Sequence, residues 1–417
     1  MTSVFIKTFG CSLNQADSEI MTGILQKAGF EIVSEPSNAD CIIINSCAVK
    51  AKTQQKFFSY LAEIKKLNKQ IIVAGCIPQA TPELVDSCSL VGPQNIHNIA
   101  AAVQRTLRGE RVRYLIPEEL DKLSLPSIRK NPLIKIIPIA EGCPGACSYC
   151  CVKRARGNLV SNPPDQIVKT AKNALKDGVR EIWLAAQDTG CYGKDIKTNL
   201  PNLLGQISSI EGEFFARVGM MNPNHLTEFL DELIEAYKSD KVFKFIHIPV
   251  QSGNDKVLKR MNRYYSVKDF RSVVGELKKR VPHLTLATDI ICGFPGETHL
   301  QFQDSLSLIK EVKPDVLNIS RFGKRPHTLA ASMQELPSEE TKRRSALMTF
   351  EWKKIALENN NRWIGWKGKV TVDEKGKGNS WVARNFAYKP IILQGNHFLG
   401  ERVTTKIVSV TANDLRS

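Results

Sequence analysis

The feature that most constrains this fold is a series of six short apolar runs, separated by segments of helical periodicity, in the middle of the chain. The runs are Ile134–Ala140, Glu181–Ala186, Phe214–Met220, Val242–Pro249, Leu284–Ile291 and Asp315–Phe322. Six strand–helix units in succession predict a partial TIM-type (β/α)6 barrel that is open on one side. Such barrels carry their chemistry at the carboxyl ends of the strands, so functional residues are expected directly after each run.

The strongest chemical signal follows the first run. Residues 141–150 read EGCPGACSYC, which places Cys143, Cys147 and Cys150 in one loop after a strand. A [4Fe–4S] cluster normally takes four thiolates, so three leave one iron free to chelate S-adenosylmethionine (SAM) and to reduce it. A zinc knuckle is the alternative, but no fourth Cys or His follows at zinc-finger spacing. The motif predicts a cluster that cleaves SAM to a 5′-deoxyadenosyl radical.

Residues 1–106 predict a separate open parallel α/β domain. Its expected strands are Val4–Phe9, Cys41–Asn45 and Ile71–Ala74, and its expected helices are Asn14–Ala28 and Ala51–Leu67. A cysteine follows each strand: Cys11, Cys47 and Cys76. Because ligands gather outside the carboxyl ends of such strands, the three could meet at one edge. The residues alone leave open whether they hold a second cluster or are buried core thiols.

The remaining segments complete the predicted organisation. Residues 107–132, with three prolines, are interpreted as a linker, and residues 133–364 as the barrel domain, which ends in a long polar helix over 338–362. Residues 365–417 predict a small OB-like β-barrel. That barrel has nine Lys and Arg against four Asp and Glu, and the whole chain has 58 against 42, for a net charge of +16. This excess predicts a polyanionic partner such as nucleic acid, although a basic solvated surface is the simpler alternative.

Composition also bounds the compartment. The N-terminus MTSVFIKTFG has no basic n-region and no long apolar core, and no apolar stretch is long enough for a membrane span. A cytoplasmic protein with no membrane association is expected. The eleven cysteines then predict metal or redox chemistry rather than disulfides.

Seven short segments together carry a family resemblance. They are TFGCSLN (8–14), NSCAV (45–49), AGC (74–76), the cysteine loop (141–150), QDTG (187–190), HIPVQSG (247–253) and DIICGFPGET (289–298). With them the chain resembles the radical-SAM methylthiotransferase family that includes MiaB, MtaB and RimO, over nearly its whole length. The C-terminal barrel resembles the family's TRAM domain, a nucleic-acid-binding module.

The resemblance implies a second [4Fe–4S] cluster on Cys11, Cys47 and Cys76, which carries the sulfur. One SAM would methylate that sulfur, and a second SAM would supply the radical that activates an inert C–H bond. The implied partners are tRNA, an electron donor such as a ferredoxin or flavodoxin, and a sulfur donor.

Further site candidates lie after the later barrel strands. Side chains that could contact SAM or substrate, or could only cap loops, are Gln187, Asp188, Gln251 and Asp289. Gly293 and Gly296 could permit close approach to SAM or could only shape a turn. His247 is interpreted as a hydrogen-bonded core histidine, and the role of Cys191 stays open.

Two basic loops bear on the substrate. They contain Lys153, Arg154 and Arg156 after the cysteine motif, and Lys324 and Arg325 after the last barrel strand. The first loop, with its Ala-Arg-Gly sequence, resembles that of family members that methylthiolate C2 of N6-threonylcarbamoyladenosine in the tRNA anticodon stem-loop. The carboxylate of this nucleoside would need a cation as its partner. The cations of the two loops could supply it, or could hold RNA phosphates instead. The alternatives are isopentenyladenosine in tRNA, an aspartate of a ribosomal protein, or a non-catalytic iron–sulfur protein that binds RNA or transfers electrons. One departure is His327, which stands where the family usually has Gly.

Overall fold

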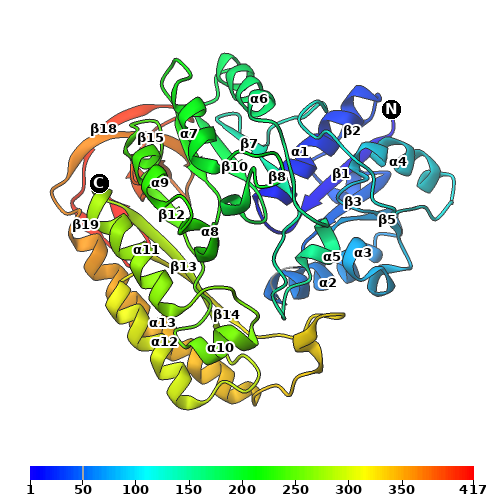
Figure 1. The fold of residues 1–417 in the computed structure, drawn as a ribbon. Helices are drawn as coiled ribbons and strands as arrows, with labels where there is room; N and C mark the ends of the chain where they lie inside the picture. Colours follow the sequence, from blue (N-terminus) through cyan, green and yellow to red (C-terminus); the bar gives the residue numbers. More distant parts are fainter. Residues whose placement is uncertain (49–50) are drawn as a thin grey trace.

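The chain forms three parts that lie side by side in this computed structural model, which describes residues 1–48 and 51–417 (Figure 1). The N-terminal part lies at one end of the view and the long helix α13 (Ser338–Asn361) lies at the other. Val49, the last residue of the NSCAV segment, lies outside the described residues.

The N-terminal part is the expected open parallel sheet. Its order is β2-β1-β3-β4-β5-β6, with bounds Glu31–Ile32, Ser3–Thr8, Cys41–Ser46, Gln70–Gly75, Ser89–Val91 and Arg113–Tyr114. Helices α1 (Ser12–Lys27) and α4 (Ile99–Leu107) pack on one face, and α2 (Ala51–Lys65) and α3 (Cys76–Ala80) pack on the other. β3 is buried along its whole length, because helices cover both faces of a parallel sheet. This arrangement brings the carboxyl ends of β1, β3 and β4 to one edge.

The segment interpreted as a linker is packed rather than free. Arg113–Tyr114 forms the edge strand β6, and Lys122 is 4% exposed. A Cβ on Gly23 of α1 would lie 2.5 Å from the backbone of Pro126, so α1 and this segment are in close contact. The three prolines signalled irregular backbone correctly, but they did not reveal that this backbone docks on α1.

The barrel part contains all six expected strands, which confirms that prediction. In chain order they are β7 (Ile134–Pro138), β10 (Glu181–Ala185), β11 (Phe215–Val218), β12 (Phe245–His247), β13 (Thr285–Cys292) and β14 (Val316–Arg321). They form two parallel three-stranded sheets, and a parallel bridge from Ala216 to Val242 joins β11 to the segment before β12. The paired β8 (Ala140–Glu141) and β9 (Val160–Ser161) enclose the cysteine loop and the short helix α5 (Val152–Arg156).

The C-terminal part is a curled sheet of six short strands in the order β18-β15-β16-β17-β20-β19. Their bounds are Arg402–Lys406, Lys367–Lys375, Ser380–Arg384, Pro390–Gln394, Leu415–Arg416 and Ser409–Val410. The sheet closes around its own small core, which includes Val372, Ile391 and Leu415. Tyr388 lies outside that core and packs with Phe243 and Phe245 of the barrel.

Candidate iron–sulfur and substrate site

Each sulfur atom of the cysteine loop has a nitrogen donor near it. The backbone N of Gly145 lies 3.3 Å from Cys143 Sγ, and the backbone N of Val152 lies 3.4 Å from Cys150 Sγ. The guanidinium of Arg263 donates to Cys147 Sγ at 3.2 Å. Burial raises the pKa of the Cys143 thiol to about 11, so a bound cation is needed to hold it as a thiolate near neutral pH. N–H donors to sulfur are a common environment of iron–sulfur ligands.

The three N-terminal cysteines meet at one sheet edge, which confirms that geometric expectation. Cys11 and Cys76 both point at the side-chain oxygen of Asn14, with Sγ–Oδ1 distances of 3.8 and 3.7 Å. A Cβ on Gly10 would lie 3.1 Å from Cys47 Sγ and 2.6 Å from its Cβ, so only glycine fits beside that thiol. Gly10 also has a φ of +120°. We call Cys11, Cys47 and Cys76 the auxiliary triad, and Cys143, Cys147 and Cys150 the loop triad.

Neither triad is packed tightly enough for a single metal ion. Among the described residues, only Asp188, Cys191 and His225 bring three ligand atoms within 4.8 Å of one another. Around one zinc ion, with Zn–S of ~2.3 Å, sulfur atoms lie roughly 3.8 Å apart. Each triad offers three sulfur donors, which is the ligand type that an iron–sulfur cluster takes.

Arg325, in the loop after β14, is buried against α2. It is 8% exposed and donates to Gln54 of α2 at 2.6 Å. Burial lowers the pKa of Arg325, and the nearby thiols of Cys151, Cys47 and Cys150 oppose that shift. Cys151 lies on the side of the N-terminal sheet that α2 covers. Its Sγ donates to Ala48 O at 3.3 Å, which joins the cysteine loop to the N-terminal part.

The basic loop after the motif does not present all three of its cations to solvent. Lys153 and Arg154 are exposed, and Arg154 Nε donates to Ala80 O at 2.7 Å. Arg156 is 1% exposed and is ion-paired with Asp17 at 2.7 Å and Glu141 at 3.1 Å. Arg156 therefore does not present its charge to solvent as the other two cations do, and its contact with substrate or RNA stays a prediction. Sequence shows the charge of a loop residue but not its burial.

The loop after β14 also contacts the N-terminal part. Lys324 is exposed, and His327 Nε2 lies 3.1 Å from Glu83 Oε1. His327 has a φ of +63°, which is the conformation that glycine adopts most easily. The departure from the family's Gly therefore leaves the backbone turn in place and adds a polar contact across the boundary.

A small cavity of about 90 Å³ lies beside the loop triad and is lined by Gly145, Cys147, Asp188, Asn222, His225 and Arg263, among others. Asp188 is 1% exposed and accepts from Asn222 Nδ2 at 2.5 Å and Gly190 N at 3.0 Å. Asn222 in turn accepts from Arg263. A hydrogen-bonded chain thus runs from Asp188 to Cys147, and Asp188 caps its own loop while it lines the cavity.

The other strand-end candidates differ in their contacts. The side-chain oxygen of Gln187 is buried and has no hydrogen-bond partner among the described residues, as an atom awaiting a ligand would be. Gln251 has a φ of +70°, and its backbone pairs with β13. Asp289 lies 3.1 Å from His247 Nε2, so His247 is hydrogen-bonded as expected. Cys191 is an internal thiol that donates to Asp188 O at 3.0 Å.

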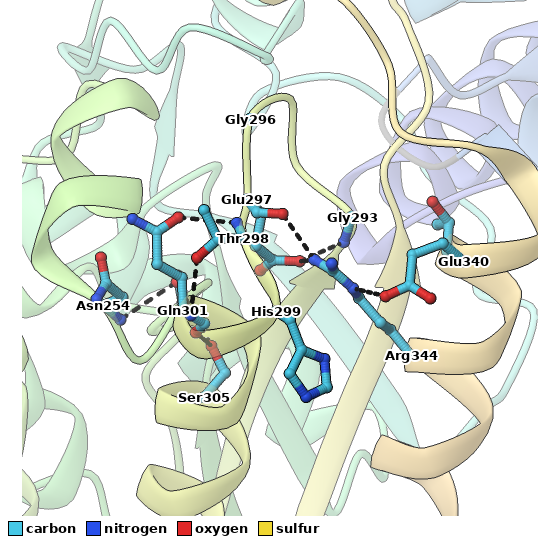
Figure 2. Close-up of polar contacts among 12 residues, drawn as sticks. Asn254, Gly293, Gly296, Glu297, Thr298, His299, Gln301, Ser305, Glu340 and Arg344 are labelled. Carbon is cyan, nitrogen blue, oxygen red and sulfur yellow. Dashed lines mark hydrogen bonds and ion pairs between the residues drawn. The ribbon is translucent and has the colours of Figure 1, made fainter.

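Gly293 and Gly296 belong to a turn that Glu297 organises (Figure 2). Gly293 N donates to Glu297 Oε2 at 2.9 Å, and Arg344 donates to the same oxygen at 2.7 Å. A Cβ on Gly293 would lie 2.5 Å from Thr341 Oγ1 of α13. The geometry of the turn and the close approach of Thr341 account for the glycine at position 293. Contact of Gly293 or Gly296 with SAM stays a prediction. Arg344 is 4% exposed, so its charge serves this turn rather than the surface.

Sequence reasoning missed two residues that the structure places against the sulfurs. Arg263 follows α10 (Asp255–Arg260), and nothing in the local sequence distinguishes it from a surface cation. Asn14 was part of the TFGCSLN segment, but its role as the shared acceptor for Cys11 and Cys76 required the tertiary structure.

Comparisons with known proteins agree with this architecture. Residues 3–90 match a family described as uncharacterized protein family UPF0004, and residues 137–309 match the radical SAM superfamily. The chain is 45% identical over 399 residues to a "Probable threonylcarbamoyladenosine tRNA methylthiotransferase" of Pyrococcus abyssi, with 94% of each chain covered. It is 41% identical over 418 residues to the human threonylcarbamoyladenosine tRNA methylthiotransferase, covering 97% of this chain and 72% of that protein.

Among solved structures, the chain resembles the radical S-adenosylmethionine methyltransferase TsrM from Kitasatospora setae, with a TM-score of 0.57 and 14% identity over 79% of this chain and 75% of that chain. A second neighbour is the cobalamin-dependent radical enzyme OxsB, with a TM-score of 0.51 and 13% identity over 84% of this chain and 56% of that chain. At these identities the likeness shows the fold alone.

Proposed function

This chain belongs to the family of radical-SAM threonylcarbamoyladenosine tRNA methylthiotransferases, and on that premise we propose that it adds a methylthio group to C2 of N6-threonylcarbamoyladenosine next to the tRNA anticodon. The loop triad would hold a [4Fe–4S] cluster with SAM, and the auxiliary triad would hold a second one. When bound, these groups supply the one-electron cleavage of SAM and the sulfur to be transferred. The observation that carries the proposal is the contact between the two cysteine segments, in which Cys151, next to Cys150, donates to the backbone oxygen of Ala48, next to Cys47, at 3.3 Å.

The protein's own residues position and enclose this chemistry. The N–H donors of Gly145, Val152 and Arg263 orient the loop sulfurs. The unpartnered oxygen of Gln187, together with Asp188, Gln251, Asp289, Gly293 and Gly296 around the strand ends, would contact SAM or substrate. Because the two cysteine segments adjoin at the Cys151–Ala48 contact, the target base would enter between the two cysteine sets.

Arg325 is the cation best placed for the threonylcarbamoyl carboxylate. A buried carboxylate is very costly without a positive partner, whereas the isopentenyl group would need only an apolar pocket. Arg325 is buried near the thiols of Cys47 and Cys150, while Lys153, Arg154 and Lys324 are exposed and suit phosphates of the stem-loop. We therefore assign to Arg325 the binding of this carboxylate, for which the sequence left the cations of both basic loops as candidates.

The partners follow from the chemistry. An electron donor such as a ferredoxin or flavodoxin and a separate sulfur donor would be needed, and the TRAM-like C-terminal sheet would bind RNA. No helix among the described residues is long and apolar enough to cross a membrane. A cytoplasmic location is part of the proposal.

The direct test offers the reconstituted enzyme matched anticodon stem-loops that carry threonylcarbamoyl, isopentenyl or no modification, with nucleoside mass spectrometry as the readout. We expect methylthio product mainly from the first. R325Q should reduce that product by about 10- to 100-fold, the loss of one charged hydrogen-bonded pair, while R325K keeps more activity. K324Q is the matched comparison on the exposed neighbour, and it should weaken stem-loop binding without changing the preference for the threonylcarbamoyl stem-loop. Efficient product from the isopentenyl stem-loop, with the threonylcarbamoyl one inert, contradicts the proposed substrate.

A further inference from the structure

A buried ion-pair network links the auxiliary triad to the helix that follows the loop triad. Lys122 lies 2.7 Å from Asp17 and 2.6 Å from Glu141, and Arg156 completes the ring by pairing with the same two acids. The four groups come from α1, the segment before β7, β8 and α5. Each side chain is at most 14% exposed. This set of charges joins the N-terminal part to the barrel.

The network reaches the auxiliary sulfurs through Arg156. Its guanidinium donates to Asn14 Oδ1 at 2.8 Å, and the same oxygen is the acceptor for Cys11 and Cys76. Burial raises the pKa of Cys76, and the positive charge and hydrogen bond of Arg156 oppose that rise. Asp17, which pairs with Arg156 at 2.7 Å, carries the opposite charge next to this guanidinium. A cation and an anion of the network therefore lie close to the acceptor that Cys11 and Cys76 share.

We propose that Arg156 is a positioning residue that the barrel supplies to the auxiliary site, where its charge sets the reduction potential of the cluster. The inference rests on the proposed function, because it needs a cluster on Cys11, Cys47 and Cys76. Adding an electron to a buried cluster adds a negative charge, which a fixed neighbouring cation favours and a fixed anion opposes. The charge of Arg156 is oriented by Glu141, which precedes the loop triad, so the potential of one site depends on the docking of the other.

A purely structural ion pair makes a different prediction. Breaking a buried pair at either end is strongly destabilising, so R156Q and D17N would both loosen the boundary in the same way. A charge effect on the cluster instead has opposite signs in the two variants. The signs of the two shifts in reduction potential therefore distinguish a charge effect from a structural role, whatever the size of each shift.

The test uses the full chain with C143A, C147A and C150A, so that the auxiliary cluster is the only one left. After anaerobic reconstitution, iron is counted and the cluster is titrated by redox-poised electron paramagnetic resonance. R156Q should lower the ratio of reduced to oxidised cluster at a fixed potential by roughly tenfold, which is 59 mV for one electron. D17N should raise that ratio, and R156K should stay near the parent. R344Q, which breaks the buried pair between α13 and Glu297 in the barrel, is the control and should leave the ratio unchanged.

Each outcome decides the inference. Shifts of the same sign in R156Q and D17N, or no shift in either, overturn it while the second cluster stands. If R156Q does not fold, D17N still gives the sign, and a lowered or unchanged ratio in D17N overturns the inference. If the parent with only the auxiliary triad binds no iron, the second cluster of the proposed function fails and this inference falls with it.

Discussion

At the scale of single residues, Asn14 shows how one side chain joins distant pieces of the site. Its amide nitrogen donates to Phe9 O and Ser46 O, which fixes the ends of β1 and β3. Its oxygen then faces the thiols of Cys11 and Cys76 and the guanidinium of Arg156. The identity of the cysteines could be predicted from their positions after strands, whereas this shared acceptor could not, because it depends on the register between three strands.

The two triads should be separable by iron content and by chemistry. With two four-iron clusters, about eight irons per chain are expected, and C143A with C147A and C150A should leave about half and abolish SAM cleavage. C11A with C47A and C76A should also leave about half, keep SAM cleavage and lose methylthio product. Iron assay and 5′-deoxyadenosine analysis measure both. Full iron in either triple variant, or normal product from the second, would show that those cysteines are only core packing.

At the scale of elements, β10 carries a buried acid that the strand pattern did not reveal. Glu181 begins β10, is 2% exposed and accepts from Trp183 Nε1 at 2.9 Å. Burial raises the pKa of Glu181 to about 7, and the nearby Asp373 of β15 adds to the rise. The alternating strand pattern predicts which positions face inward, but not that one inward position holds an acid.

This acid gives the stability of the fold a defined pH dependence. The folded-state pKa of Glu181 is raised to about 7, above the ordinary 4.5, so folding favours its protonated form. The resulting stability is complete below pH 4.5 and is lost as the pH rises towards 7. E181Q should therefore be more stable than the parent at pH 8 by up to about 3 kcal/mol, and nearly equal to it at pH 4.5. Urea unfolding at the two pH values measures this, and an equal difference at both would contradict it.

At the scale of the whole molecule, charge is distributed unevenly between surface and interior. Of the nine cations in residues 365–417, Lys389 is paired internally with Asp315 of the barrel, and Arg384 is paired with Asp373. The others include Lys367, Lys369 and Lys406, which are exposed on the adjacent strands β15 and β18. The excess charge of the sequence is therefore a smaller, localised patch on the folded protein.

That patch should carry part of the RNA affinity. Each phosphate contact contributes roughly −0.7 to −0.9 to the slope of log affinity against log salt, so K367Q with K369Q and K406Q should flatten the slope by about 2 to 3. Filter binding of tRNA between low and moderate salt gives the slope. K65Q with K66Q, at the end of α2 away from the cysteines, is the control. An unchanged slope in the triple variant would place the RNA surface elsewhere.

The sequence by itself determined the three-part architecture, the six barrel strands and the positions of both cysteine triads. These features follow from local periodicity and from the rule that parallel strands present their carboxyl ends to one edge, both of which can be read along the chain. The family resemblance indicated the reaction, because the segments that carry the resemblance lie at the carboxyl ends of the strands.

Only the tertiary structure decided which cations are exposed and which are buried against partners. Arg156 and Arg344 have the same sequence signature as exposed basic residues, but each is buried against acids from distant segments. Arg325 is instead buried near the thiols of Cys47 and Cys150. Burial depends on how separate segments pack, and a charged side chain can be buried only where that packing supplies partners, so its role cannot be inferred from its neighbours in sequence.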